Sequence, residues 1–144
     1  MSSVQQSSMV SAKGGTLTPV RTGYEMVIYR RCSDRFAVDA KQGGSVTEVS
    51  DRHIQVKYAD DSVVGYPLGI EHGGAAGAVI PHRIITDLEV GDTFNEGDAL
   101  CWNEAYFQRD ILNPGGVSMR GGTMAYTAFM ETTDTLEDSS AISP

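Results

Sequence analysis

The sequence contains few of the residues that bind metals or form covalent cross-links. Among 144 residues there are 2 cysteines and 3 histidines. Cys32 and Cys101 lie far apart, and neither they nor the histidines show the spacing of a redox or zinc motif. We expect both thiols to be buried and reduced. A disulfide bond would need their Cα atoms within about 7 Å, which the sequence leaves open.

Positive charge is also scarce. The chain has 11 Lys and Arg against 19 Asp and Glu, for a formal net charge of −8. Proteins that bind duplex nucleic acid usually carry a basic face that neutralises phosphates, so direct nucleic-acid binding is not expected. Arg30, Arg31 and Arg35 could form a local basic patch. Solvated charges on strands and loops are the simpler interpretation.

No run of apolar residues is long enough to span a membrane. Such a span needs about 18 or more consecutive apolar residues, and none occurs. Residues 1–15 lack the basic and apolar regions of a signal peptide, so the chain is not expected to be secreted or to reach a membrane. The 40% apolar and 21% charged residues are ordinary for one globular domain with a real core.

The two ends differ in composition from the middle. Residues 1–15 are rich in Ser, Gln and Gly, and residues 131–144 are acidic and rich in Ser and Thr. Neither segment can bury enough apolar surface to fold alone. The sequence therefore predicts a flexible N-terminal arm at 1–15, a domain at 16–130 and an acidic C-terminal arm at 131–144. We expect the arms to become ordered only against a partner.

Strand signals dominate the predicted domain. Apolar and polar residues alternate strictly over residues 54–58, as in a half-buried strand. Residues 59–62 have turn chemistry and residues 63–66 resume the strand pattern, which predicts a hairpin. Residues 45–49 follow two glycines and form another strand candidate.

Glycine marks the expected turns. The chain has 16 glycines, and a Gly-Asp pair occurs at residues 91–92 and again at 97–98. Each pair is typical of a tight turn, because Gly takes positive φ at little steric cost. These signals predict a mainly β fold, a compact β-barrel or barrel-sandwich hybrid with extended arms. At most one short helix is expected, over residues 103–112 and ended by residues 113–116.

Other catalytic interpretations have little support. His53 lies in a strand-like run, where a solvated polar face explains it. His72 lies in the Gly-rich segment 71–77, which lacks the Lys of a phosphate-binding loop and is interpreted as a flexible loop. Cys101 paired with a histidine such as His82 could act as a nucleophile, but a core thiol is the simpler interpretation.

Five motifs in series resemble a known family. In chain order they are residues 20–25 (V-G-T-G-x-E in the family), 40–46 (A-K-x-G-G-x-V), 90–100 (V-G-D-x-V-x-x-G-D-x-L), 128–130 (A-F-M) and 137–143 (E-D-S-I-x-I-S). Each motif alone is unspecific, but the ordered series resembles the β subunit of multisubunit RNA polymerases, up to its central Glu-Asp pair. We interpret the chain as a viral, phage-type derivative of that segment.

The resemblance implies a role for the acidic pair. In the family this pair lies at the active centre and helps to position the metal-bound nucleotide, since Mg²⁺ takes carboxylate and phosphate oxygens together. If the chain serves a polymerase, Glu137 and Asp138 are its candidate catalytic and metal-binding residues. The high-affinity metal site of the family belongs to aspartates of another subunit, so the chain cannot be a polymerase by itself.

Departures from the family pattern argue against retained catalysis. The family's G-Q-N element reads Gly-Thr-Met at residues 122–124. An aromatic-rich run is replaced by residues 131–136, in which Glu131 and Asp134 add negative charge beside the acidic pair. Unneutralised carboxylates repel one another and any phosphate. The sequence ends at Pro144, before the family's basic residues, so we expect no enzyme activity, cofactor or metal in the chain alone.

Two functions follow from these expectations. The first is a non-catalytic structural or binding protein, most simply a virion component that decorates or cements a capsid and contacts other protein subunits through its arms. The alternative is a small split fragment of a viral RNA polymerase β subunit, with Mg²⁺ at a shared active centre. A third, weaker idea is an inhibitor that mimics β. The expected location is the virion or the host cytoplasm.

Overall fold

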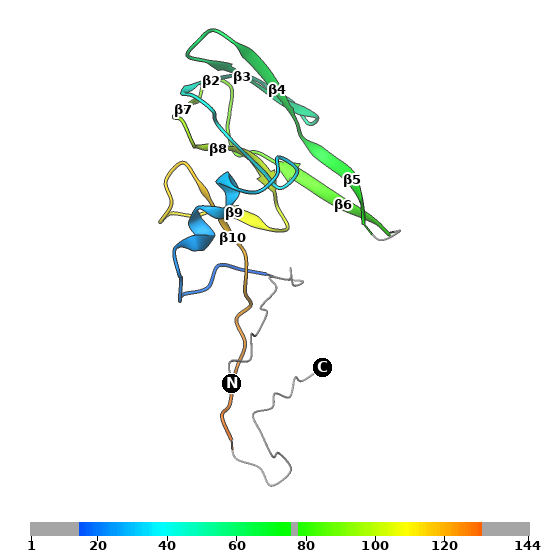
Figure 1. The fold of residues 1–144 in the computed structure, drawn as a ribbon, viewed down its shortest axis with the longest axis vertical. Helices are drawn as coiled ribbons and strands as arrows, with labels where there is room; N and C mark the ends of the chain where they lie inside the picture. The colour runs from blue at the N-terminus through cyan, green and yellow to red at the C-terminus, as the bar shows by residue number, and fades with distance from the viewer. Residues whose placement is uncertain (1–14, 76–77, 131–144) are drawn as a thin grey trace, which may run out of the picture.

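A computed structural model describes residues 15–75 and 78–130, and Figure 1 traces the chain through ten short strands and two 3-10 turns. The elements are, in order, η1 (Tyr24–Met26), η2 (Ile28–Arg30), β1 (Ala37–Asp39), β2 (Gly44–Val49), β3 (His53–Tyr58), β4 (Val63–Pro67), β5 (Gly69–Ala75), β6 (Ala78–Ile85), β7 (Thr93–Phe94), β8 (Ala99–Asn103), β9 (Phe107–Arg109) and β10 (Val117–Met119).

The strands form two four-stranded antiparallel sheets and one hairpin. The first sheet has the order β4-β3-β2-β7, the second β1-β8-β6-β5, and β9 pairs with β10. This arrangement confirms the predicted mainly β class. Within the described residues the sheets are sandwich-like and are not closed into a barrel, so the sandwich part of the predicted hybrid is the observed one.

The predicted hairpin forms one side of the first sheet, with β4 at the edge and β3 inside. β3 and β4 pair in register from His53 opposite Pro67 to Lys57 opposite Val63. The period-2 pattern decides which side chains enter the core: Ile54, Val56 and Tyr58 are buried, and the residues between them face outward. The predicted strand at 45–49 is β2, on the other side of β3.

The main core lies between the two sheets. Its buried side chains come from both sheets, which is how a two-layer β fold removes its apolar faces from water. The buried members are Val38, Ala40, Val46, Ile54, Val56, Tyr58, Ile84, Phe94, Leu100 and Cys101.

A second core lies around the β9–β10 hairpin and the 3-10 turns. Its buried members are Tyr29, Ala37, Ala99, Trp102, Phe107 and Val117. β8 contributes to both cores and is buried at all five positions. A strand of this kind reads as a continuous apolar run rather than an alternating one, as residues 99–102 do.

Both Gly-Asp pairs form the predicted turns, with φ of 94° at Gly91 and 82° at Gly97. The two turns make the same bonds. Gly91 N–H donates to Val46 O, and Val46 N–H donates to the carbonyl of the Asp that follows Gly91, at 2.9 and 2.8 Å. Gly97 and its Asp make the same exchange with Ala40, at 2.8 and 2.8 Å. The first turn is thereby bonded to β2 in the first sheet, and the second turn is bonded to the residue that follows β1 in the second sheet.

The short helix expected over residues 103–112 was a wrong prediction. This segment is the end of β8, a turn and β9. Asn103 Oδ1 accepts from Ala105 N–H at 3.0 Å, and Asp110 Oδ1 accepts from Leu112 N–H at 3.1 Å. These local side-chain bonds compete with helical hydrogen bonds and favour turns. Among the described residues the only helical turns are the two 3-10 turns upstream.

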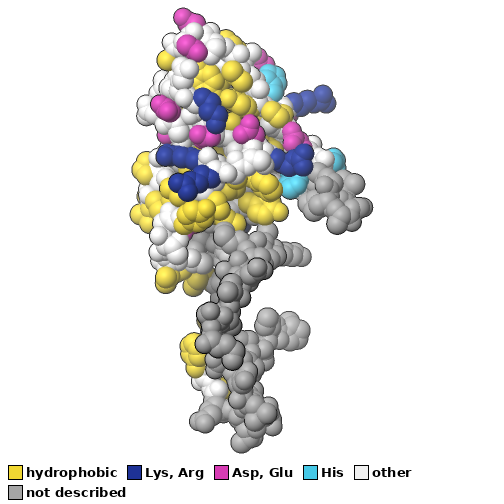
Figure 2. All heavy atoms as spheres, in the orientation of Figure 1, with side chains coloured by type: hydrophobic (Ala, Val, Ile, Leu, Met, Phe, Trp, Pro, Cys, Tyr) yellow, Lys and Arg dark blue, Asp and Glu magenta, His cyan; other side chains and the backbone are white. Residues whose placement is uncertain are grey.

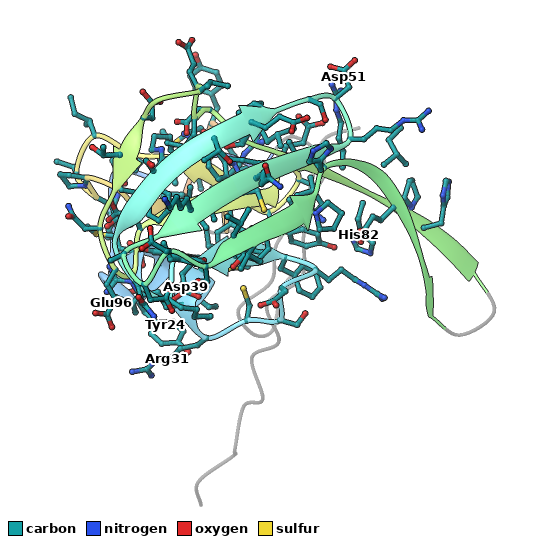
Figure 3. All side chains as sticks on the ribbon, turned by 90° about the horizontal axis from the view of Figure 1, so that it is seen from above. Tyr24, Arg31, Asp39, Asp51, His82 and Glu96 are labelled. Atoms are coloured by element: carbon teal, nitrogen blue, oxygen red, sulfur yellow. The ribbon has the colours of Figure 1, made fainter. Side chains whose placement is uncertain are left out.

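The β5–β6 hairpin extends away from the rest of the fold, as Figures 1 and 3 show. β5 pairs with β6 from Gly69 opposite Ile84 to Ala75 opposite Ala78. Residues 71–75, predicted to be a flexible loop, belong to β5 instead, because the following segment supplies an antiparallel partner. Within 15–75 and 78–130 no helix has the length and apolar character needed to cross a bilayer.

Candidate interaction site at the C-terminal arm

The two cysteines are not joined by a disulfide bond. Cys32 and Cys101 are both free thiols, one half-buried and one buried. They belong to different cores, so they do not approach as a disulfide pair. Burial raises the pKa of the Cys32 thiol, and it raises the pKa of Cys101 to about 12. Cys101 is therefore a buried core thiol whose raised pKa disfavours the thiolate form.

The three histidines do not meet. His53 Nδ1 lies 2.9 Å from Ser50 Oγ, and its Nε2 lies 3.3 Å from a carboxylate oxygen of Glu48, in the β2–β3 turn. His72 is exposed on β5. Within the part of the chain that the structure describes, no three His, Cys, Asp or Glu side chains gather closely enough to hold a metal ion.

His82 is the buried histidine. Asn103 Nδ2 lies 2.8 Å from His82 Nδ1, and Asn103 Oδ1 is already taken by Ala105 N–H. The amide nitrogen is therefore placed to donate to Nδ1. The ring also packs against Phe36 and Tyr106, with centroids 5.8 and 6.5 Å away. This cluster joins the root of the long hairpin to β8.

The arginines considered as a basic patch do not act together. Arg30 Nε donates to Tyr29 Oη at 2.9 Å and to Gly97 O at 3.2 Å, so this guanidinium holds the second Gly-Asp turn. Arg31 and Arg35 are exposed, and Figure 3 shows Arg31 pointing away from the fold. In Figure 2 basic and acidic side chains are interspersed on the visible face. Solvated charges remain the simpler interpretation.

The most unusual surface is an extended arm at residues 121–130. After β10 the chain leaves the domain and runs straight away from it (Figure 1). The arm carries four large apolar side chains, whose exposed fractions lie between 69% and 110%. They are Met124, Tyr126, Phe129 and Met130. So much contiguous exposed apolar surface is typical of a binding segment.

The root of the arm is firmly held. Thr16 N–H donates to Gly122 O at 2.7 Å, which makes a short antiparallel bridge. Arg120 N–H donates to Tyr106 O at 2.7 Å, and its guanidinium donates to the carbonyls of Gly15 and Glu104 at 2.8 Å each. These bonds fix the direction in which the arm leaves the domain.

A partly buried ion pair supports the same region. The guanidinium of Arg21 donates to a carboxylate oxygen of Asp110, whose side chain is buried. Ser118 Oγ donates to the same oxygen at 3.0 Å, and Leu112 N–H donates to the other. Burial pushes the pKa of Asp110 upward, but the bonds from Leu112, Arg21 and Ser118 outweigh it and leave the pKa below its ordinary value.

A cavity of about 290 Å³ opens at the root of the arm. It lies between the segment that precedes η1 and the chain that leaves β10, and most of its lining surface is apolar. It is lined by Leu17, Thr18, Val20, Arg21, Thr22, Tyr24, Glu25, Met119, Gly121 and Gly122. The first two residues of the arm are therefore part of the cavity wall.

The polar edge of this cavity is a local hydrogen-bonded arrangement. Thr22 Oγ1 donates to Glu25 Oε2 at 2.6 Å and accepts from Tyr24 N–H at 3.2 Å, a local side-chain bond to the backbone just before η1. The Thr22 hydrogen bond lowers the pKa of Glu25. These bonds order the short turn η1 and hold the cavity wall in place.

The sequence predictions placed the functional residues elsewhere. Glu137 and Asp138 lie outside the described residues, as does the N-terminal arm before Gly15. Residues 123–130 were assigned to the domain, because the boundary was placed at residue 131, where the acidic, Ser- and Thr-rich composition begins. A signal was present: residues 123–130 contain no charge, glycine or proline and no partner strand follows them in the described chain.

Comparison with protein-family models gave no match, and comparison with curated proteins gave no significant relative. The site must therefore be interpreted from its own geometry.

Proposed function

We propose that the chain is a non-catalytic structural component of a larger protein assembly, which it joins through the extended arm at residues 121–130. The observation that carries this proposal is the fully exposed, uncharged, apolar strand-like segment at residues 123–130. An extended segment of this type binds by adding a strand to a sheet, where main-chain hydrogen bonds give affinity and side-chain pockets give specificity.

The construction of the arm supports a role in assembly. Its root is bonded to the domain on both sides, through Thr16 and Arg120, so the domain presents the arm in one direction. Preorganised presentation reduces the entropy lost on binding. The domain itself is an antiparallel scaffold whose Gly-Asp turns and double core hold it together independently of the arm.

Within this class we favour a virion component that decorates or cements a capsid. A small acidic domain with a net charge of −8 and one exposed apolar arm is suited to a repetitive protein surface rather than to nucleic acid. The supporting features are the net charge and the exposed apolar arm.

Quantitative mass spectrometry of purified virus particles tests this function. We expect the chain in fixed, multiple-copy proportion to the main shell protein. Particles stripped of the chain should rebind the full-length protein but not the Phe129→Asp variant, whereas an Ile70→Asp variant, altered at an exposed apolar residue on β5, should rebind normally. Absence of the chain from particles would remove the proposal.

A split RNA polymerase β fragment is the second candidate, and the ordered motif series favours it. Two of those motifs coincide with structural features described above. Residues 90–100 contain the paired Gly-Asp turns, and residues 128–130 form the tip of the arm. Under this proposal the arm would join a sheet of another polymerase chain and carry Glu137 and Asp138 toward a shared Mg²⁺ site.

This candidate makes a different prediction. The chain should co-purify at one copy per complex with larger polymerase chains, and Asp138→Ala should lower the transcription rate of that complex. An unchanged rate, with the variant fully incorporated, would reject it. Asp134→Ala, which lies outside the motif, is the matched control.

A further inference from the structure

The arm has the composition of a strand that lacks a partner. Residues 123–130 read Thr-Met-Ala-Tyr-Thr-Ala-Phe-Met, and no described residue makes a backbone hydrogen bond to them. In an extended strand alternate side chains share a face, so Met124, Tyr126 and Met130 lie on one face and Phe129 on the other. Each unpaired backbone group on this segment can pair with another strand.

The arm is complementary to itself in one antiparallel register. If Tyr126 pairs with Tyr126 of a second copy, the pairs that follow are Met124 with Ala128, Thr123 with Phe129, and Gly122 with Met130. Each of the remaining large apolar side chains is then opposite a small one. Large-with-small pairing lets facing side chains interdigitate, and a central aromatic pair adds to the stability of an antiparallel ribbon.

The same register brings the tip of one arm to the cavity of the other copy. Residues 122 to 130 span about 26 Å at ~3.3 Å per residue, so paired arms place Met130 opposite Gly122. Gly122 lines the cavity, together with apolar side chains such as Val20 and Tyr24. Methionine is flexible and fills irregular apolar gaps well. The cavity and the arm tip are thus complementary in position and in chemistry.

We propose that two copies of the chain form a two-fold dimer in which their arms pair antiparallel about Tyr126 and each Met130 enters the cavity at the root of the partner's arm. The interface is isologous, since each copy supplies one arm and one cavity. This inference rests on the proposed function and names the first partner of the arm. From Thr123 to Met130, no described residue bonds to the remaining edge of each arm, which can pair with a further sheet.

The oligomeric state of the purified full-length chain is the first test. Light scattering after size-exclusion chromatography should give twice the 15.5 kDa chain mass. Tyr126→Asp should restore the monomer mass, because it places two like charges opposite each other at the axis. Ile70→Asp introduces the same charge at an exposed apolar residue far from the arm and should stay dimeric. Unchanged circular dichroism would show that each variant is folded.

Cross-linking tests the register. In a Cys32→Ser background, Tyr126→Cys should form an intermolecular disulfide in high yield under mild oxidation, because the register places this residue opposite itself. Phe129→Cys should not, because its own copies lie far apart; paired with Thr123→Cys in a mixture of the two variants it should form a mixed disulfide. A disulfide between two Phe129→Cys chains, with none at Tyr126→Cys, would reject the register.

The outcomes separate this inference from the proposed function. A chain that is monomeric at all concentrations overturns the dimer, and a dimer that survives Tyr126→Asp overturns the role of the arm. Either result leaves the particle-binding experiment free to succeed. Conversely, a Tyr126-centred dimer that does not occur on virus particles supports the dimer and rejects the assembly role.

Discussion

The packing around residue 44 leaves no room for a side chain larger than that of glycine. A Cβ at Gly44 would overlap the backbone carbonyl of Lys57 on β3 and lie 3.0 Å from the Phe94 ring. The first obstacle is backbone in the middle of the sheet and cannot move aside. Gly65 on β4 is the opposite case, since a Cβ there meets nothing within 4 Å.

We therefore expect Gly44→Ala to lower the free energy of unfolding by about 1–3 kcal/mol, the usual range for overpacking. Gly65→Ala should change it by less than about 1 kcal/mol in either direction. Urea unfolding followed by Trp102 fluorescence measures both. Equal effects of the two substitutions would contradict the packing explanation.

Asp110 makes stability depend on pH. Its folded-state pKa lies below the ordinary value of 3.8, so the unfolded chain binds a proton more readily than the folded one. The stabilisation is complete above the ordinary pKa and is lost as the pH falls through the lower folded-state pKa.

We expect the free energy of unfolding to fall as the pH drops below about 4, with a smaller decrease in Asp110→Asn. The variant should also be less stable at neutral pH, by about 1.5–3 kcal/mol, because Arg21 would lose its charged hydrogen-bond partner. Thermal unfolding across the acidic range measures both effects. Asp51→Asn, at an exposed turn, is the control and should keep the full pH dependence.

At the scale of elements, the strands were predictable where one short pattern decided the structure. Strict alternation at residues 54–58 and a turn at 59–62 were sufficient for the β3–β4 hairpin, and both Gly-Asp turns were placed correctly. The helix expected at 103–112 was wrong, because composition does not reveal that Asn103 and Asp110 bond their own backbone. The apolar arm was missed, because exposure depends on whether a partner strand exists.

The Gly-Asp turns differ in their surroundings, which leads to a prediction. Asp92 Oδ2 accepts from Glu89 N–H at 2.8 Å in an exposed turn, whereas Asp98 Oδ2 accepts from Asn95 N–H at 2.9 Å and its carboxylate packs against Gly115. Asp92→Ala should cost about 1 kcal/mol, the usual value for one lost capping hydrogen bond. Asp98→Ala should cost about 1 kcal/mol more. Chemical denaturation of the two variants side by side measures the difference.

At the scale of the whole molecule, β8 holds two cores in one cooperative unit. Leu100 and Cys101 belong to the core between the sheets, and Ala99 and Trp102 belong to the core against the β9–β10 hairpin. Neither core can open without exposing this strand. The β5–β6 hairpin, by contrast, extends beyond both.

Native-state hydrogen exchange should therefore be slowest at β8 and β3 and should require global unfolding there. The backbone amides of the outer part of β5 should exchange by local opening, at rates several orders of magnitude faster. Mass spectrometry of peptides from the exchanged protein resolves the two classes. Protection of the outer hairpin equal to that of β8 would contradict this division.

The paired Gly-Asp turns have a consequence for how this sequence can change. Each turn is hydrogen-bonded to one residue, the first to Val46 in one sheet and the second to Ala40 beside the other. The number of residues between Gly91 and Gly97 is therefore set by the distance between these two bonding positions. Substitutions between the two glycines leave this spacing unchanged. A single inserted or deleted residue changes the spacing and must break the hydrogen bonds of one turn. Divergent versions of this domain should differ in the identity of the residues between the two glycines but keep the same number of residues there.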